Sequence, residues 1–449
     1  MNSSNPQSPL QMVIIGAGHR SLAYAEYALE HPDRARVVAV AEPDPVRRKM
    51  AADLHQIPRE RQFESCHELT ARPKMAQAAI NGTMDHLHHA TTLQLLEAGY
   101  HILLEKPIAP CESEVVDLIR AARRHQRVIM VCHVLRYALF YQTIKQLLVD
   151  GKIGSIVAMH TSENVSYHHM AAAFIRGKWR RTEANPMLLA KCCHDLDIIA
   201  WMMQGNRARR VASFGSLMQF KPENAPPGSA LRCLDGCRIE SSCPYSARAN
   251  YITQGLWGPY VWHSIEHIPN PTIEDKLHSL RTDNPFGRCV WHCDNDVVDH
   301  QTVAIEYENG ATVTHNMLCA TARPTRTIHV LGTGGEIEGD LSAGIIKIRI
   351  PHAVPGRGYD EELISGEQYS DSAKGHGGTD EKIVADFVNL IAGNPAALGA
   401  TRIEDSLAGH QIAYAADEAM RCRRVVEIQQ YDFTTISSTE SDKIPCHNG

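Results

Sequence analysis

The sequence lacks any hydrophobic run of membrane-spanning length. It also lacks an excess of positive charge: 45 Lys and Arg stand against 51 Asp and Glu, and the formal net charge of −6 provides no basic field for nucleic acid. The first ten residues show no charged start followed by an apolar stretch, so no signal peptide is visible. We therefore expect a cytoplasmic protein with neither nucleic acid nor membrane among its partners.

Length and composition are those of an ordinary globular protein with two domains. The chain of 449 residues is long enough for two hydrophobic cores, and 43% of its residues are hydrophobic. From residue 11 to residue 133, short apolar runs alternate with helical patterns, which predicts a parallel sheet flanked by helices. Strands are expected at 12–15, 35–41, 78–81, 101–104 and 127–132. Helices are expected at 19–30, 93–98 and 115–124.

Beyond Gly154 the pattern changes to short runs of alternating residues, and Asn309-Gly310 between two of them is a strong hairpin signal. We therefore expect an α/β protein with two domains. Residues 10–133 would bind a dinucleotide, and residues 134–433 would form an α+β domain with a large, mostly antiparallel open sheet. The predicted features of this second part are strands at 156–159, 303–307, 312–317 and 345–350, helices at 379–391 and 404–420, an irregular insertion at about 221–288, and a disordered tail at 434–449.

A glycine motif, Gly16-Ala17-Gly18, joins the first predicted strand to the first helix. Glycines there let the backbone approach a pyrophosphate, and the helix start offers free N–H donors. Glu42 ends the second strand and suits a carboxylate that binds a ribose 2′-hydroxyl. Ser21 occupies the place of the third glycine or alanine, so a turn that binds nothing is the alternative. The predicted dinucleotide contacts are Gly16, Gly18, His19, Arg20, Ser21 and Glu42.

A second motif, Glu105-Lys106-Pro107, follows the apolar run 101–104. Ligands of open α/β sheets bind beside the carboxyl ends of the strands, where this lysine would lie. Its amine can hydrogen-bond a reacting oxygen, and positive surroundings would lower its pKa toward proton transfer. Pro107 would fix the turn that orients the lysine, for which a cis peptide bond is one route.

Three segments together resemble the family of glucose-fructose oxidoreductase and inositol dehydrogenase, the Gfo/Idh/MocA family. They are 98–107 (A-G-Y-H-I-L-L-E-K-P), 151–154 (G-K-I-G) and 193–197 (C-H-D-L-D). The resemblance implies a Rossmann domain and an enzyme that uses NAD and acts on a sugar, polyol or related hydroxylated compound. It places Lys106 and His194 beside the nicotinamide and implies a homo-oligomer, a dimer or tetramer. Further cofactor contacts are implied at Thr83, Met84, His88 and Glu105.

The sequence departs from the family pattern near the histidine. Many relatives have an aspartate four residues before it, where this chain has Ala190, followed by Lys191. Lys191, Tyr167 and His168 are therefore further candidates for proton transfer. Polar groups that could bind sugar hydroxyls are Asn164, Trp179, Asp195, Asn295, Asp296, His300 and His376. For the last four of these, a solvated loop or a simple helix cap is the alternative.

The insertion contains Cys233, Cys237 and Cys243 in the spacing C-x₃-C-x₅-C. Three thiolates need a fourth ligand for a tetrahedral zinc site, which Cys193, Cys289, Cys293 or a histidine could supply. Structural zinc, buried free thiols and a redox role all remain open. Thirteen cysteines, an odd number, make a disulfide framework improbable.

Three functions are compatible with these features. The first is an NAD-dependent oxidoreductase that transfers hydride between nicotinamide and a hydroxyl-bearing carbon of a sugar, polyol or glycoside. The second is a glycoside hydrolase or lyase that works by transient oxidation at C3, elimination and return of the hydride. The third, a non-catalytic cofactor-binding regulator, is disfavoured because Lys106 and His194 are both present.

Overall fold

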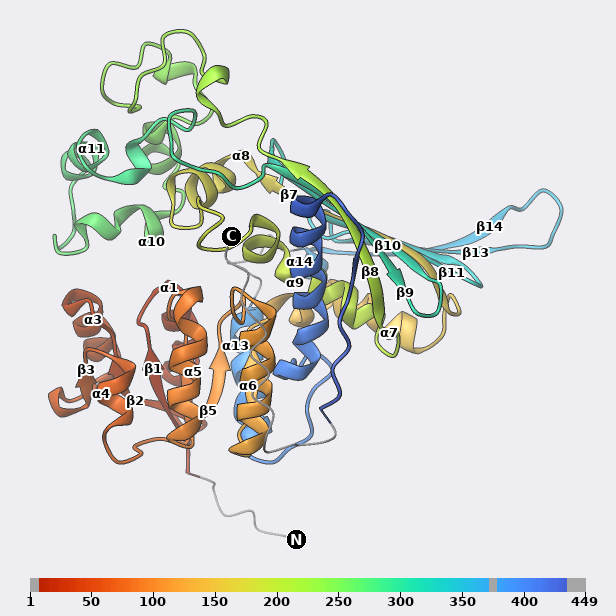
Figure 1. The fold of residues 1–449 in the computed structure, drawn as a ribbon, viewed down its shortest axis with the longest axis horizontal. Helices are drawn as coiled ribbons and strands as arrows, with labels where there is room; N and C mark the ends of the chain where they lie inside the picture. Colours follow the sequence, from red (N-terminus) through yellow and green to blue (C-terminus); the bar gives the residue numbers. More distant parts are fainter. Residues whose placement is uncertain (1–7, 371–377, 434–449) are drawn as a thin grey trace.

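The computed structural model describes residues 8–370 and 378–433, and these residues contain two separate sheets (Figure 1). His376 and the predicted tail at 434–449 lie outside the described residues. The first sheet has six parallel strands in the order β3-β2-β1-β4-β5-β6. Its strands are β1 (Leu10–Ile15), β2 (Ala35–Ala41), β3 (Gln62–Phe63), β4 (Ala78–Asn81), β5 (His101–Leu104) and β6 (Ile129–Val131).

Helices cover both faces of this sheet, because its central strands are apolar on both sides. They are α1 (His19–Ala25), α2 (Tyr27–Glu30), α3 (Pro45–His55), α4 (Cys66–Thr70), α5 (His88–Glu97) and α6 (Glu112–Arg124). In α6, Val115, Leu118, Ile119 and Ala122 recur at helical spacing and are buried against the sheet. Alternation of strand and helix in the sequence therefore gives the predicted doubly wound domain.

The chain returns to this domain after the second sheet. Helix α13 (Thr379–Ile391) buries Ile383 and Phe387 in the same cluster as Met12 and Ile14 of β1. Helix α14 (Ile403–Cys422) contributes Ile403 to the cluster on the other face. Both helices form where the periodicity predicts them, and they join the two parts of the molecule.

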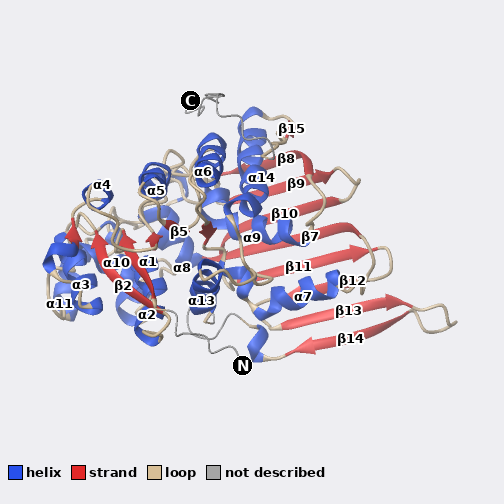
Figure 2. Cartoon of the chain, turned by 90° about the horizontal axis from the view of Figure 1, so that it is seen from below, coloured by secondary structure: helices blue, strands red, loops and turns tan. Residues whose placement is uncertain are grey.

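The second sheet has nine strands in the order β14-β13-β12-β11-β7-β10-β9-β8-β15. Strands β7 and β10 are parallel and every other neighbouring pair is antiparallel, with Gly310 (φ +86°) in the hairpin between β9 and β10. Helices α7 (Leu139–Val149), α9 (Met187–Met202) and α14 cover one face (Figure 2). The strands are β7 (Ile156–Ser166), β8 (Ala208–Ser216), β9 (His300–Tyr307), β10 (Thr312–Thr321), β11 (Thr325–Gly332), β12 (Glu336–Asp340), β13 (Ile345–Pro351), β14 (Tyr359–Ser365) and β15 (Val426–Glu427).

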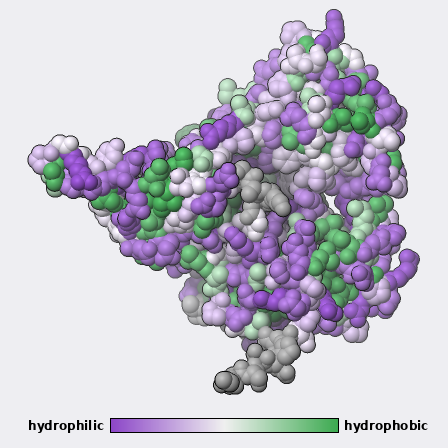
Figure 3. Space-filling view, turned by 180° about the vertical axis from the view of Figure 1, so that it is seen from behind, coloured by the Kyte–Doolittle hydropathy of each residue, from purple (hydrophilic) through white to green (hydrophobic). Residues whose placement is uncertain are grey.

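The surface is mixed in character. The face seen in Figure 3 is largely hydrophilic, with hydrophobic residues gathered in separate areas. On the strands of the second sheet, Phe214, Leu318 and Leu331 expose 75%, 43% and 45% of their surface. Within residues 8–370 and 378–433, no helix combines the length and apolar character needed to cross a bilayer.

The insertion occupies the chain between β8 and β9. It contains short helical turns and the helices α10 (Gly258–Val261) and α11 (Ile273–Arg281). In Figure 1 it lies above the end of the first domain at which α1 and α3 begin. The insertion is irregular, as predicted, yet Tyr251, Val261, Leu280 and Phe286 form a buried cluster of their own. This cluster stabilises the insertion without a regular sheet.

Candidate active site

The glycine motif forms a tight turn between β1 and α1. Gly16 has a φ of +77°, and a Cβ there would lie 3.0 Å from the backbone of Gly82 and Thr83, so only glycine fits. Ser21 is fully buried, and its Oγ would lie 2.2 Å from a Cβ added at Gly82. The close approach of helix and sheet, usually provided by the third glycine, is thus provided here by Gly82.

Glu42 lies across this turn. Its carboxylate accepts hydrogen bonds from the backbone N–H of Ala17 (2.7 Å) and of Asp44 (2.9 Å). The two arginines that follow are occupied elsewhere. Arg47 pairs with Glu266 of the insertion (2.9 Å), and Arg48 donates to the carbonyl oxygen of Glu42 (2.5 Å). The Glu42 carboxylate is therefore buried at the end of β2, and Glu42 is not among the residues that line the cavity described below. The guanidinium groups of Arg47 and Arg48 are both engaged.

Lys106 follows β5, with a cis peptide bond between it and Pro107. Its Nζ donates to the carbonyl oxygen of Ala190 (3.3 Å) on α9. Burial alone would lower the pKa of Lys106, but Cys193, Glu105 and Asp85 outweigh that effect and raise the pKa above its ordinary value. The expectation of a lowered pKa is therefore wrong, and Lys106 is a charged hydrogen-bond donor.

His194 lies on the buried face of α9, one turn beyond Lys191. Lys191 Nζ pairs with Oε1 of Glu163 on β7 (2.8 Å). Arg326 on β11 places its Nε 2.6 Å from Glu163 Oε2 and 2.8 Å from Asp195 Oδ1. Burial raises the pKa of Asp195, but Arg326, His315 and Lys191 together outweigh that effect, so the pKa of this carboxyl lies below its usual value. Lys191 and Arg326 thus compensate the charges of two buried carboxylates beside His194.

One cavity of about 1250 Å³ connects these groups. Gly18, His19 and Arg20 line one part of it, and Lys106 and His194 line another. The predicted contacts Thr83, Glu105, Asn164, Trp179 and Lys191 also line it. A volume of this size is enough for a dinucleotide together with a small polar substrate.

Several predicted residues lie elsewhere. His88 lies between two carbonyl oxygens, with Nδ1 2.8 Å from that of Pro107 and Nε2 3.1 Å from that of Thr83, and Met84 accepts from Lys178 Nζ (3.1 Å). The described residues that line the cavity do not include Tyr167, His168, Asp195, Asn295, Asp296 or His300.

Local contacts explain these positions. His168 Nδ1 accepts from Trp257 (3.1 Å), and its neighbour His169 lines the cavity instead. Asp296 accepts from the backbone N–H of Thr182 (2.6 Å), while His300 contacts Asp299 (2.9 Å). These contacts order loops, which is the alternative that the sequence analysis left open for Asp296 and His300.

The structure adds residues that the sequence did not indicate. Glu163 and Arg326 come from strands far apart in the chain, and no motif marks them. Behind His194, the ring of His133 lies 5.6 Å away edge-on, and its Nε2 lies 2.6 Å from Ser406 Oγ. Burial holds the pKa of His133 well below its usual value, so this histidine is neutral. His194 therefore packs against buried polar residues, namely His133 and its partner Ser406.

The cysteines of the insertion do converge. Cys233, Cys237, Cys243 and Cys289 line one small cavity of about 10 Å³, and all four are free thiols. Cys233 Sγ, however, accepts from the buried Arg176 guanidinium (3.4 Å). Among the described residues, these sulfur atoms do not form a set with metal-ligand spacing, so the structure does not support the predicted zinc site.

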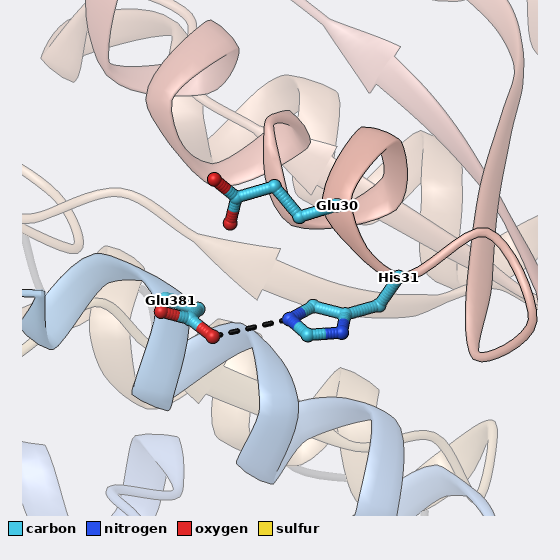
Figure 4. Close-up of side chains that lie close together, drawn as sticks. All are labelled: Glu30, His31 and Glu381. Carbon is cyan, nitrogen blue, oxygen red and sulfur yellow. Dashed lines mark hydrogen bonds and ion pairs between the residues drawn. The ribbon is translucent and has the colours of Figure 1, made fainter.

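The set that does have such spacing, within 4.8 Å, is Glu30, His31 and Glu381 (Figure 4). Glu30 and Glu381 are exposed, and the histidine pairs with Glu381 (3.1 Å) to join α2 to α13. Exposed carboxylates of this kind occur commonly without an ion. We assign no metal to them.

The fold and the cavity define a two-domain, dinucleotide-binding oxidoreductase. The chain belongs to the Gfo/Idh/MocA oxidoreductase family: "Oxidoreductase family, NAD-binding Rossmann fold" matches residues 10–133, and "Oxidoreductase family, C-terminal alpha/beta domain" matches residues 145–428. The YteT protein of Bacillus subtilis (strain 168) is 24% identical over 311 residues, which is 68% of this chain and 70% of that protein. The 2,7-anhydro-N-acetylneuraminate hydratase of Escherichia coli (strain K12) is 26% identical over 34% of this chain and 39% of its own length.

Solved structures with the same fold cover nearly the whole chain. The WlbA dehydrogenase of Chromobacterium violaceum, in complex with NADH and UDP-GlcNAcA, has a TM-score of 0.64 at 16% identity and covers 96% of this chain and 100% of its own. An inositol dehydrogenase homologue of Azotobacter vinelandii, in complex with NADH and myo-inositol, has a TM-score of 0.63 at 16% identity, with the same coverage. At these identities the likeness establishes the fold.

Proposed function

We propose that the protein is an NAD-dependent oxidoreductase that transfers hydride between nicotinamide and a hydroxyl-bearing carbon of a sugar, polyol or glycoside. The observation that carries this proposal is the single cavity that reaches from Gly18 and His19 to Lys106 and His194. It brings the dinucleotide loop and two proton-handling groups to one space. The sugar and polyol ligands named for the two structures above support the substrate class.

The residues of the first domain fit the cofactor. Gly16 leaves room that a Cβ would fill, Gly18 has open space beside it, and Glu42 suits a ribose hydroxyl. NAD, when bound, supplies the hydride acceptor of the reaction. The turn from Gly16 to Gly18 would hold its pyrophosphate.

The groups around the substrate divide the proton chemistry between them. Lys106 remains protonated because acidic neighbours raise its pKa, so it donates a hydrogen bond to the reacting oxygen and polarises it. His194 takes the hydroxyl proton during oxidation and returns it during reduction. Lys191 is held by Glu163 (2.8 Å), so it contributes charge and position beside the histidine.

The test is turnover with a panel of sugars, polyols and glycosides, followed through the absorbance of NADH. We expect oxidation of at least one class and its loss in His194→Ala, while the control His329→Ala, an exposed histidine on β11, retains activity. Absence of NADH formation with every compound, in protein that binds NAD⁺, would remove net oxidation as the function.

A redox-neutral reaction is the second candidate, and the likeness to an anhydro-sugar hydratase favours it. In this reaction hydride leaves C3, the more acidic C2 proton is removed, elimination breaks the glycosidic bond, and the hydride returns. His169, which lines the cavity together with Lys191, would add a second group for proton transfer. Aglycone release from a glycoside without accumulation of NADH would identify this reaction.

We further propose that the open face of the second sheet contacts a second copy of the chain. Phe214 on β8, Leu318 on β10 and Leu331 on β11 are apolar side chains exposed on this sheet, and an interface with a second copy would cover them. Light scattering should show a dimer or tetramer, and Phe214→Asp should lower the mass. A wild-type monomer at micromolar concentration would contradict the proposal.

A further inference from the structure

The insertion contacts the first domain beside the predicted ribose site. Glu266, just beyond α10, pairs with Arg47 Nε at 2.9 Å, and the two side chains are 24% and 27% exposed. Arg47 lies in the first turn of α3, which begins shortly after Glu42. Residues far apart in the sequence, and in different parts of the fold, thus meet at the end of β2.

In dinucleotide-binding folds, residues at this position contact the 2′-group of the cofactor's ribose. A carboxylate after the second strand binds the 2′-hydroxyl of NAD, whereas an arginine nearby accommodates the 2′-phosphate of NADP. The chain has both groups, Glu42 and Arg47, and Arg47 lines the cavity. From the first domain alone, the preference for NAD over NADP would be ambiguous.

Contacts within the insertion hold Glu266 in place. His263 Nε2 lies 3.4 Å from Glu266 Oε1, and the ring of Tyr260 meets His19 of the dinucleotide turn edge-on at 5.8 Å. Asn284 is fully buried and donates to the carbonyl oxygen of Val261 (2.8 Å), which fixes this segment on the cluster of the insertion. The carboxylate of Glu266 therefore reaches Arg47 from a supported position.

We infer that Glu266 is a specificity-determining residue, which holds Arg47 away from a 2′-phosphate and so gives the enzyme its preference for NAD over NADP. The inference rests on the proposed use of a nicotinamide cofactor and extends it to an element outside the dinucleotide domain. Arg48 does not replace Arg47, because it donates to the carbonyl oxygen of Glu42 and pairs with Glu64 (3.3 Å). Release of Arg47 from its partner should therefore be enough to improve NADP binding.

The experiment is a double-mutant cycle read by calorimetric titration with NAD⁺ and NADP⁺. Glu266→Gln should raise the affinity for NADP⁺ about tenfold, the scale of one charge-assisted hydrogen bond, and change that for NAD⁺ by less than about threefold. Arg47→Ala alone should leave NADP⁺ affinity unchanged, but it should abolish the gain when combined with Glu266→Gln. Glu362→Gln, which breaks a comparable pair with Lys152 (2.9 Å) on the second sheet, is the matched control and should change neither affinity.

The outcomes separate this inference from the proposed function. Wild-type protein that binds neither cofactor would refute the proposed function. Protein that binds NAD⁺, with no gain in NADP⁺ affinity in Glu266→Gln, would refute the inference alone. A gain that persists without Arg47 would also refute it, and melting temperatures for each variant show whether the fold is retained.

Discussion

Replacement of Arg326 by methionine should destabilise the protein strongly, because two buried carboxylates share this guanidinium. Its Nε lies 2.6 Å from Glu163 and 2.8 Å from Asp195, and both acids expose only 4–5% of their surface. Lys191 would still compensate Glu163 (2.8 Å), so Asp195 would lose its cation. Breaking a buried pair on one side costs about 3–5 kcal/mol of unfolding free energy, and methionine preserves most of the packing volume.

The pH dependence follows from the same contacts. In the wild type the pKa of Asp195 is lowered, so its contribution to stability is present above the unfolded pKa of about 3.9 and is lost as pH falls through the folded pKa. In Arg326→Met, burial without the cation raises that pKa instead. The variant should therefore differ most from the wild type at neutral pH and less in acid, where Asp195 gains a proton.

Urea unfolding at neutral and acidic pH measures this difference. Adding Asp195→Asn should recover a large part of the loss, because the uncompensated charge is then absent. Arg424→Met, at an exposed ion pair with Glu418 (2.6 Å), serves as the control and should leave stability unchanged. A loss below about 1 kcal/mol at neutral pH, or the same loss in the Asp195→Asn background, would refute the reasoning.

Three further results are expected. Lys106→Ala and His194→Ala should each lower turnover at least about a hundredfold with cofactor affinity nearly unchanged, and wild-type rates in a folded variant would remove that residue from the mechanism. Calorimetry should show tighter binding of NAD⁺ than of NADP⁺, because Glu42 would repel a 2′-phosphate while Glu266 keeps Arg47 from binding one; the reverse order would contradict both roles. Gly82→Ala should cost about 1–3 kcal/mol of stability through its 2.2 Å approach to Ser21 Oγ, and Ser21→Ala should suppress that cost in urea unfolding; an equal loss in both backgrounds would exclude this contact as the cause.

The first domain was predictable because its signals are local. Strands β2, β4 and β5 and helix α13 have the predicted bounds, since each is a short apolar or amphipathic run bordered by turn residues. Ser21 looked like a defect in the motif, and only the fold shows that Gly82 compensates for it. That compensation joins two elements about sixty residues apart and leaves no pattern in the sequence.

Site residues that belong to a sequence motif could be predicted. Site residues that come together only through strand pairing could not. Lys106 and His194 follow from family segments, and the cavity brings both together. Glu163 and Arg326 come from strands whose pairing depends on the register of the whole sheet. The polar residues near residue 295 left two alternatives open, because polar density alone does not distinguish a loop that bonds backbone groups from one that faces a ligand.

The most direct test of the central claim is a single-turnover measurement with NAD⁺ bound to the purified enzyme. On addition of the sugar, polyol and glycoside panel, the account predicts reduced nicotinamide within one turnover for at least one compound, persisting for net oxidation and transient for redox-neutral cleavage. It also predicts that the His194→Ala variant binds NAD⁺ but forms no reduced nicotinamide. NAD⁺-loaded wild-type enzyme that never forms reduced nicotinamide, or a His194→Ala variant that forms it at the wild-type rate, would contradict the account.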